Sequence, residues 1–364
     1  MEAEAAPDAK ATRAQGVARD ARRIIERVHE NLIFYQIVGV VSASGTSLAD
    51  AANRVIHDCL GLRQGESFLV VTDTVSSPEL ARSLFAAADQ AGADAAAIVI
   101  APPARSGEEP PHPVATAMAA ADACVCAASR SLYHTAAKGR AQQLGTRGLF
   151  NAPHRAEAWT SGAMTADFLA VREIAERLAD RLRGARQVHV TSPAGTDVVM
   201  SVEGREPKGW LTGVCRNPGE ISALPGGEVS FPPVEGTVEG TVVIEHVMTD
   251  LGRLSDPITW TVRAGEAVDF VGGTDAERLR RLIEGVPNAQ NIAELGIGLN
   301  AAARLEGDIT EAKKRAGTAH MALGDNAGGY GGTVESPIHL DGLMLDVTVS
   351  VDGSLVVDGG EILA

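Results

Sequence analysis

Two observations in the sequence predict a chain of two domains, an α/β domain followed by an α+β domain. The chain has 364 residues, more than the roughly 250–300 residues at which a single hydrophobic core usually stops growing. Up to about residue 185 helical periodicity alternates with short apolar runs, and beyond it strands alternate with glycine-rich turns. We therefore expect an α/β N-terminal domain with a mostly parallel sheet over residues 1–185. Residues 186–364 are expected to form an α+β, largely antiparallel C-terminal domain.

The first half shows helical periodicity in six segments, separated by continuous apolar runs of strand length. The expected helices are residues 18–29, 48–60, 79–90, 114–121, 135–144 and 166–182. The expected strands are residues 68–72, 96–100, 123–128 and 148–150. Strands that are apolar on both faces and alternate with helices are typical of a parallel sheet covered on both sides.

The loop after the first expected strand lacks a nucleotide-binding signature. The sequence there is Val71-Thr-Asp-Thr-Val75, where a dinucleotide or phosphate site would have a glycine-rich loop. The α/β domain is therefore expected to act as a scaffold.

The second half is expected to be mainly antiparallel strands with one helix. The expected strands are residues 188–191, 197–202, 241–247, 258–270, 344–351 and 355–357, and the expected helix is residues 275–283. The turns of this half carry nearly all the residues that could form a site.

Composition excludes several classes of partner. The formal net charge is −15, and no tract rich in lysine and arginine interleaves with aromatic residues. We therefore expect neither nucleic acid nor an anionic membrane surface as a partner, and we expect a small-molecule substrate.

The four cysteines, Cys59, Cys124, Cys126 and Cys215, are too few and too irregularly spaced for a disulfide framework or a four-thiolate zinc site. No apolar run could span a bilayer and the N-terminus lacks a secretory signal, so we expect a cytoplasmic protein.

A histidine and an aspartate stand two residues apart in Ser336-Pro-Ile-His339-Leu-Asp341-Gly342. In a β-strand alternate side chains share a face, so His339 and Asp341 would point the same way while Ile338 and Leu340 pack on the other side. Such a pair can supply two metal ligands. On its own it is more typical of a surface strand with two polar residues.

Three further donors lie in glycine-punctuated segments of the same half. Glu228 follows the Gly226-Gly227 turn, Glu294 is followed by glycines at 296 and 298, and His320 lies in Gly317-Thr-Ala-His-Met. Singly, each has an ordinary explanation: a solvated turn residue, an edge-strand charge or a hydrogen-bonded core histidine. Together with His339 and Asp341 they form an oxygen and nitrogen ligand set suited to zinc, manganese, cobalt or ferrous iron.

These motifs, taken in order, resemble a known superfamily. Leu224-Pro-Gly-Gly-Glu-Val229, Ala293-Glu-Leu-Gly-Ile-Gly298, His320-Met-Ala-Leu-Gly324 and Ile338-His-Leu-Asp341 look like the aminopeptidase T and S metallopeptidases. They look equally like that family's relatives, 2,5-dihydroxypyridine 5,6-dioxygenase and the 5-nitroanthranilate aminohydrolase type. The resemblance is strong over the C-terminal half and loose over the N-terminal half.

The resemblance implies a metal site and a site tyrosine. It makes Glu228, Glu294, His320, His339 and Asp341 metal ligands. In the peptidases such a set would hold two ions, whereas the dioxygenases bind one ferrous ion through a few of these positions. The tyrosine that the peptidases carry after the first histidine has no counterpart at that spacing, and Tyr330 is the nearest candidate for contacting substrate.

The resemblance also implies an N-terminal histidine and a subunit partner. For the dioxygenases it implies a histidine for proton transfer in the N-terminal domain, for which His134 is the best candidate, with a capping or buried role as the alternative. It further implies a homodimer.

Two enzyme classes follow from this ligand set. The first is a metal-dependent hydrolase, aminopeptidase-like or aminohydrolase-like, in which a metal-activated water attacks a small amide or amine. There Glu228 or Glu294 would serve as general base and Arg216 could pair with a substrate carboxylate. The alternative is a non-haem Fe(II) dioxygenase that cleaves a hydroxylated N-heterocycle.

The retained Glu228 and Glu294 pair favours the hydrolase, while the absent tyrosine spacing favours a small-molecule substrate. A structural ion in a protein without catalytic activity is the third hypothesis.

Overall fold

The computed structural model describes residues 46–209, 211–327 and 331–363. The chain divides into two compact units, one of residues up to 161 together with 215–224, the other of residues 162–214 and 225 onward. The boundary predicted between residues 185 and 186 does not coincide with this division. The predicted helix at residues 18–29 lies outside the described residues.

The first unit is built on a five-stranded sheet in which every neighbouring pair is parallel. Its order is β2 (Asp94–Ile100), β1 (Ser67–Asp73), β3 (Ala123–Cys126), β4 (Arg147–Leu149) and β7 (Ile221–Ser222). Strand β1 is buried along both faces, Phe68 and Val70 on one and Leu69 and Val71 on the other. This explains why its sequence is a continuous apolar run, and it confirms the predicted α/β class.

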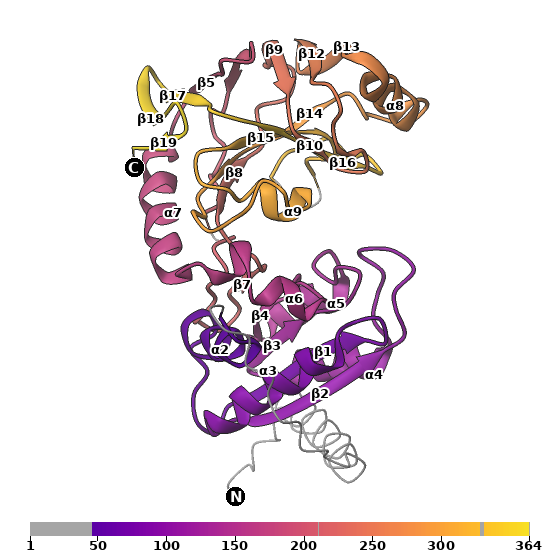
Figure 1. The fold of residues 1–364 in the computed structure, drawn as a ribbon, viewed down its shortest axis with the longest axis vertical. Helices are drawn as coiled ribbons and strands as arrows, with labels where there is room; N and C mark the ends of the chain where they lie inside the picture. Colours follow the sequence, from indigo (N-terminus) through magenta and orange to yellow (C-terminus); the bar gives the residue numbers. More distant parts are fainter. Residues whose placement is uncertain (1–45, 210, 328–330, 364) are drawn as a thin grey trace, which may run out of the picture. The chain divides into compact units, whose positions relative to one another are not determined.

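Helices alternate with these strands as the periodicity predicts (Figure 1). They are α2 (Leu48–Arg54, continued by a π-turn at Val55–Cys59), α3 (Pro78–Gln90), α4 (His112–Ala120), α5 (Ala136–Gln143) and α6 (Ala156–Trp159). Ser47 caps α2 in a reciprocal capping box with Asp50, and the Thr135 hydroxyl caps α5. Helix α3 packs against β1 and β2, and α4 packs against β1.

The second unit begins with helix α7 (Phe168–Leu182), which is capped by Asp167 and packs against strand β8 (Glu228–Phe231). Two antiparallel sheets follow. The eight-stranded sheet has the order β13 (Glu266–Val271), β12 (Ile258–Arg263), β9 (Glu239–Ile244), β6 (Asp197–Ser201), β5 (Gln187–Thr191), β17 (Thr348–Val351), β18 (Ser354–Asp358) and β19 (Glu361–Ile362). The six-stranded sheet has the order β11 (Gly252–Arg253), β10 (Val247–Met248), β16 (His339–Met344), β15 (Ala319–Gly324), β14 (Ile292–Gly298) and β8. The remaining helices of this unit are α8 (Gly273–Ile283) and α9 (Ile309–Ala312).

The two sheets share one hydrophobic core. Trp260 and Val242 from the eight-stranded sheet belong to the same buried cluster as Leu295 and Met321 from the six-stranded sheet. Where β16 meets β9, a Cβ on Gly342 would lie 2.8 Å from the Ile244 side chain, so any larger residue would force Ile244 to move. The largely antiparallel class predicted for the C-terminal half is confirmed.

Three details of the predicted second half are wrong. Residues 258–270 are a hairpin rather than one strand, because Ala264 and Gly265 take positive φ and reverse the chain between β12 and β13. The predicted strand at residues 344–351 is interrupted between β16 and β17, where Asp346 has a φ of 49°. Glu228, Glu294 and His320 lie on strands rather than on turns, as the next subsection describes. Among the described helices, none is both long and apolar enough to cross a membrane.

Candidate metal centre

Five of the predicted donors lie on one face of the six-stranded sheet. Glu228 is on β8, Glu294 on β14, His320 on β15, and His339 and Asp341 on β16. The residues between them, among them Leu295, Met321 and Leu340, point into the shared core. Because side chains alternate along a strand, the five donors must point to the opposite face. The prediction that His339 and Asp341 share a face is confirmed.

Small residues opposite the donors leave room for them. In the ladder Gly298 pairs with Glu228, Gly296 with His320 and Ala322 with Asp341. A Cβ on Gly296 would lie 2.0 Å from Cε1 of His320, so the imidazole ring lies directly on the β14 backbone. Gly227 has a φ of 126°, which only glycine readily adopts, and turns the chain into β8 just before Glu228.

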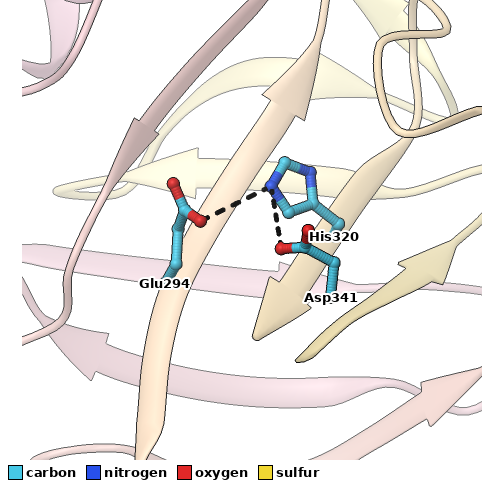
Figure 2. A group of neighbouring side chains, drawn as sticks. All are labelled: Glu294, His320 and Asp341. Atoms are coloured by element: carbon cyan, nitrogen blue, oxygen red, sulfur yellow. Dashed lines mark ion pairs between the residues drawn. The ribbon is translucent and has the colours of Figure 1, made fainter. Parts of the chain in front are cut away.

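The donor atoms converge on the Nε2 atom of His320. This nitrogen lies 3.9 Å from Glu294 Oε2, 3.8 Å from Asp341 Oδ1 and 3.7 Å from Glu228 Oε2. Figure 2 shows Glu294, His320 and Asp341 pointing toward one another, with dashed lines from His320 to the two carboxylates. One donor atom from each of these three residues lies within 4.8 Å of the other two.

His339, the second donor on β16 beside Asp341, completes the cluster. Its Nδ1 donates to the carbonyl of Asp325 at 2.7 Å, and its Nε2 lies 3.0 Å from Glu294 Oε2 and 3.4 Å from Asp341 Oδ1. Burial alone would lower the pKa of His339, but the two carboxylates outweigh it and raise this pKa to about 10. Because Nδ1 is committed to the carbonyl, Nε2 is the nitrogen available to a metal in the neutral ring.

Buried polar atoms without hydrogen-bond partners mark the centre of the cluster. They include Glu228 Oε2, Asp341 Oδ1 and both ring nitrogens of His320. Buried groups of this kind are rare in native proteins and call for a ligand or ion. Three of these atoms face the same point, and imidazole with carboxylate is a donor set that first-row divalent metals accept. The residues present therefore fit a divalent metal ion.

Two lysines beside the cluster were not among the residues predicted from the sequence. Lys314 Nζ forms an ion pair with Glu228 Oε1, and Lys313 Nζ lies 2.9 Å from Asp341 Oδ2. Burial alone would raise the pKa of Glu228, but Lys313 and Lys314 outweigh it and hold this pKa below its usual value. The signal available in the sequence was a pair of adjacent lysines in a strongly acidic chain.

The other predicted site residues are not in this cluster. His134 belongs to the first unit, where its exposed ring makes an edge contact with Tyr133 at 5.1 Å between centroids. Thr135, not His134, caps α5. Arg216 also belongs to the first unit and donates from Nη2 to the carbonyl of His57 at 3.0 Å. Tyr330 lies outside the described residues. The roles assigned to these three residues, and the homodimer, stay predictions.

The whole described fold resembles known proteins. The family model described as "NicX: 2,5-dihydroxypyridine 5,6-dioxygenase" matches residues 47–364. The structure of 2,5-dihydroxypyridine dioxygenase from Pseudomonas putida KT2440 has a TM-score of 0.72 at 23% identity, covering 87% of this chain and 97% of the other. Wild-type AmpT from Thermus thermophilus has a TM-score of 0.58 at 19% identity, covering 87% and 99%. None of the curated proteins matches. The resemblance stated from the sequence motifs is confirmed.

Proposed function

The chain belongs to the NicX family, described as 2,5-dihydroxypyridine 5,6-dioxygenase, and we propose that it is a ferrous-iron dioxygenase that opens the ring of a hydroxylated N-heterocycle. This proposal reverses the order of preference drawn from the sequence, in which a hydrolase came first. The family match over residues 47–364 favours the alternative that the sequence left in second place.

The observation that carries the proposal is the convergence of unpartnered imidazole and carboxylate atoms in a buried cluster. Glu294, His320 and Asp341, with His339 beside them, would hold the iron. Two histidines and one carboxylate are the ligands of many non-haem iron oxygenases, which leave positions open for substrate and dioxygen. The chemistry that such an ion supplies is activation of dioxygen toward the bound ring.

The protein's own residues orient and neutralise the site. The Asp325 carbonyl fixes the tautomer of His339, because it accepts the Nδ1 proton. Lys313 holds the outer oxygen of Asp341 and leaves the inner oxygen facing His320 and His339. His320 is fully buried, so bulk water is excluded from this side of the cluster. For proton transfer to the substrate we retain His134 as the proposed residue.

A hydrolase remains the second candidate, on one specific observation. Glu228 Oε2 is buried and makes no hydrogen bond, lies 3.7 Å from His320 Nε2 and 3.8 Å from Lys313 Nζ, and so offers a fifth donor that an iron site of this type does not need. In a hydrolase Glu228 would act as general base, which is most effective when its pKa lies near the working pH. The pKa of Glu228 is instead held low by Lys313 and Lys314, which makes it a poor base and favours the dioxygenase.

The test is oxygen uptake by the full-length protein after anaerobic loading with ferrous iron, using 2,5-dihydroxypyridine as substrate. We expect about one dioxygen consumed per ring opened, with ring loss followed by absorbance. The control variant His320→Ala should keep its fold by circular dichroism and lose at least about a hundredfold in activity, because loss of a metal ligand should exceed the 10–100-fold effects of its supporting residues. Turnover of amides or aryl-amines in strictly anoxic buffer with zinc or manganese, without oxygen uptake on the pyridine, would overturn the proposal and favour the hydrolase.

A further inference from the structure

Two consecutive lysines form one wall of the metal cluster. Only 6% of the Lys314 side chain and 15% of the Lys313 side chain are exposed. Burying an ammonium group is costly unless it is paired, so lysines are seldom placed this way without a partner. Here the partners are two carboxylates of the cluster: Glu228 for Lys314, and Asp341 with the more distant Glu228 for Lys313.

The backbone is built to present both lysines to the cluster. They follow α9 directly, and Asn300 N–H donates to the Lys314 carbonyl at 2.7 Å. The Asn300 side chain also donates to the carbonyl of Gly226, in the turn that precedes Glu228. A Cβ on Gly298 would lie 2.8 Å from the Lys313 carbonyl, so the lysine segment lies directly against β14. The lysines and Glu228 are thus tied to one rigid framework.

Each lysine binds the outer oxygen of its carboxylate. Lys313 Nζ binds Asp341 Oδ2, while Asp341 Oδ1 lies 3.8 Å from His320 Nε2 and 3.4 Å from His339 Nε2. Lys314 binds Glu228 Oε1, while Glu228 Oε2 faces His320 Nε2 at 3.7 Å and Lys313 Nζ at 3.8 Å. Both inner oxygens lack hydrogen-bond partners. Each carboxylate can therefore offer the centre one oxygen and has none left to reach a second ion on its outer side.

Charge balance leads to the same conclusion. When His339 is neutral, as metal binding requires, Glu228, Glu294 and Asp341 carry three negative charges and Lys313 and Lys314 carry two positive ones, which leaves one negative charge. One divalent ion changes this to one positive charge, and two ions change it to three. Lys208, which interacts electrostatically with Glu294 and Glu228, adds another positive group nearby. Because an uncompensated buried charge is strongly destabilising, a second ion is disfavoured.

We propose that Lys313 and Lys314 are positioning residues that hold the outer oxygens of Asp341 and Glu228 and so restrict the centre to one divalent ion. This inference rests on the proposed function, because it requires the cluster to be a metal site. It assigns the lysines no contact with substrate.

The experiment is a titration of metal-stripped, full-length protein with manganese, followed by calorimetry and by electron paramagnetic resonance, which distinguishes isolated from coupled ions. Wild type should bind one equivalent. Lys314→Met should bind a second equivalent and give a coupled spectrum, because Glu228 Oε1 is released and one positive charge is lost. Lys314→Arg, which keeps the charge, should remain at one. Lys138→Met, which removes a partly buried lysine in the other unit, is the matched control and should also remain at one.

Lys313→Met keeps the proposal testable where Lys314→Met does not fold, because Lys313 is the more exposed of the two. It should also admit a second ion, through Asp341 Oδ2. One equivalent in every folded lysine variant, or two equivalents in wild type, overturns the inference. Ring-opening with oxygen uptake by wild type alongside unchanged stoichiometry in the variants would sink the lysine role alone. Wild type that binds no ion would sink the proposed function as well.

Discussion

Two buried aspartates in this chain have opposite surroundings. Asp73, at the end of β1 in the first unit, is 2% exposed, and Asp341, on β16 in the second unit, is 7% exposed. Asp73 accepts five hydrogen bonds at 2.5–3.0 Å, from the backbone and hydroxyl of Ser76 and Ser129 and from the backbone of Val75. Asp341 Oδ1 accepts none and faces two imidazoles.

The comparison separates a structural carboxylate from a ligand. Asp73 lies where parallel α/β sheets often bind ligands, at the carboxyl ends of the strands where the order changes direction between β1 and β3. Its oxygens are nevertheless saturated by the protein itself, so it ties the β1 and β3 loops together. Position in the fold alone would have pointed to the wrong aspartate, whereas the hydrogen-bond inventory points to Asp341.

The largest effect on stability is expected from Asp73→Ala. Removing the carboxylate abolishes five hydrogen bonds and leaves the N–H and hydroxyl groups of the half-buried Ser129 without this acceptor, whereas the Ser76 hydroxyl keeps the Ala127 carbonyl; together the losses should cost about 3–5 kcal/mol of unfolding free energy. Metal binding in the second unit should be unchanged. Chemical denaturation and manganese titration measure the two quantities.

The matched control for this variant is Asp122→Ala. Asp122 also accepts from a serine, Ser67, but at an exposed position, so its loss should cost less than about 1 kcal/mol. Equal destabilisation by the two variants would mean that saturation of Asp73 is not what makes it structural.

The first and second units also differ in how well their strands could be predicted from the sequence. The strands of the first unit were predictable, because β1 to β3 are apolar on both faces and separated by clear helices. In the second unit β14 and β15 were missed as strands although they carry Glu294 and His320. Their outer face alternates donors with Gly296, Gly298 and Ala322, and glycine and alanine are weak strand formers. Full burial on both faces also removes the alternation of polar and apolar residues that identifies a strand.

The ligand set was easier to predict from the sequence than the strands that carry it. Glu228, Glu294, His320, His339 and Asp341 were all chosen from motifs, and all five meet in the structure. Lys313 and Lys314 were missed because their role depends on a backbone position fixed by Asn300 and Gly298, which no spacing in the sequence expresses. Adjacent lysines after a short helix otherwise indicate only a solvated surface.

An intermediate effect is expected from Gly296→Ala, which tests the packing of the His320 ring against the Gly296 backbone without removing any donor. The added methyl would lie 2.4 Å from His320 Nε2, so the ring must shift. Overpacking of this kind costs about 1–3 kcal/mol of stability, and misplacing a ligand should weaken manganese binding by about 10–100-fold. Thermal unfolding without added metal and calorimetric titration separate the two effects.

Gly139→Ala is the control for an added methyl group. Gly139 lies in α5 with nothing near its Cβ position, so alanine should be neutral or stabilise the helix by up to about 1 kcal/mol. If Gly296→Ala binds manganese like wild type, the ring of His320 does not depend on the glycine and the packing argument fails.

The smallest effect is expected from Glu235→Gln, at a third carboxylate that extends the comparison toward the cluster. Glu235 accepts from Asn326 Nδ2 at 3.0 Å and from Thr333 N–H at 2.8 Å, and it pairs with Arg205. Burial alone would raise the pKa of Glu235, but these contacts lower it below its ordinary value. Its stabilising contribution is therefore present above about pH 4.3, the ordinary glutamate value, and is lost as pH falls through the lowered pKa of the folded state.

Glutamine at position 235 should cost about 1 kcal/mol at pH 7 and progressively less as the solution is acidified below pH 4. Unfolding free energies measured from pH 7 to pH 3 should thus converge for the variant and wild type, while manganese affinity at pH 7 stays unchanged. A constant difference across this range would show that the charge of Glu235 is irrelevant. A loss of manganese affinity would show instead that a saturated carboxylate can support the centre through Asn326 and the adjoining Asp325 carbonyl that orients His339.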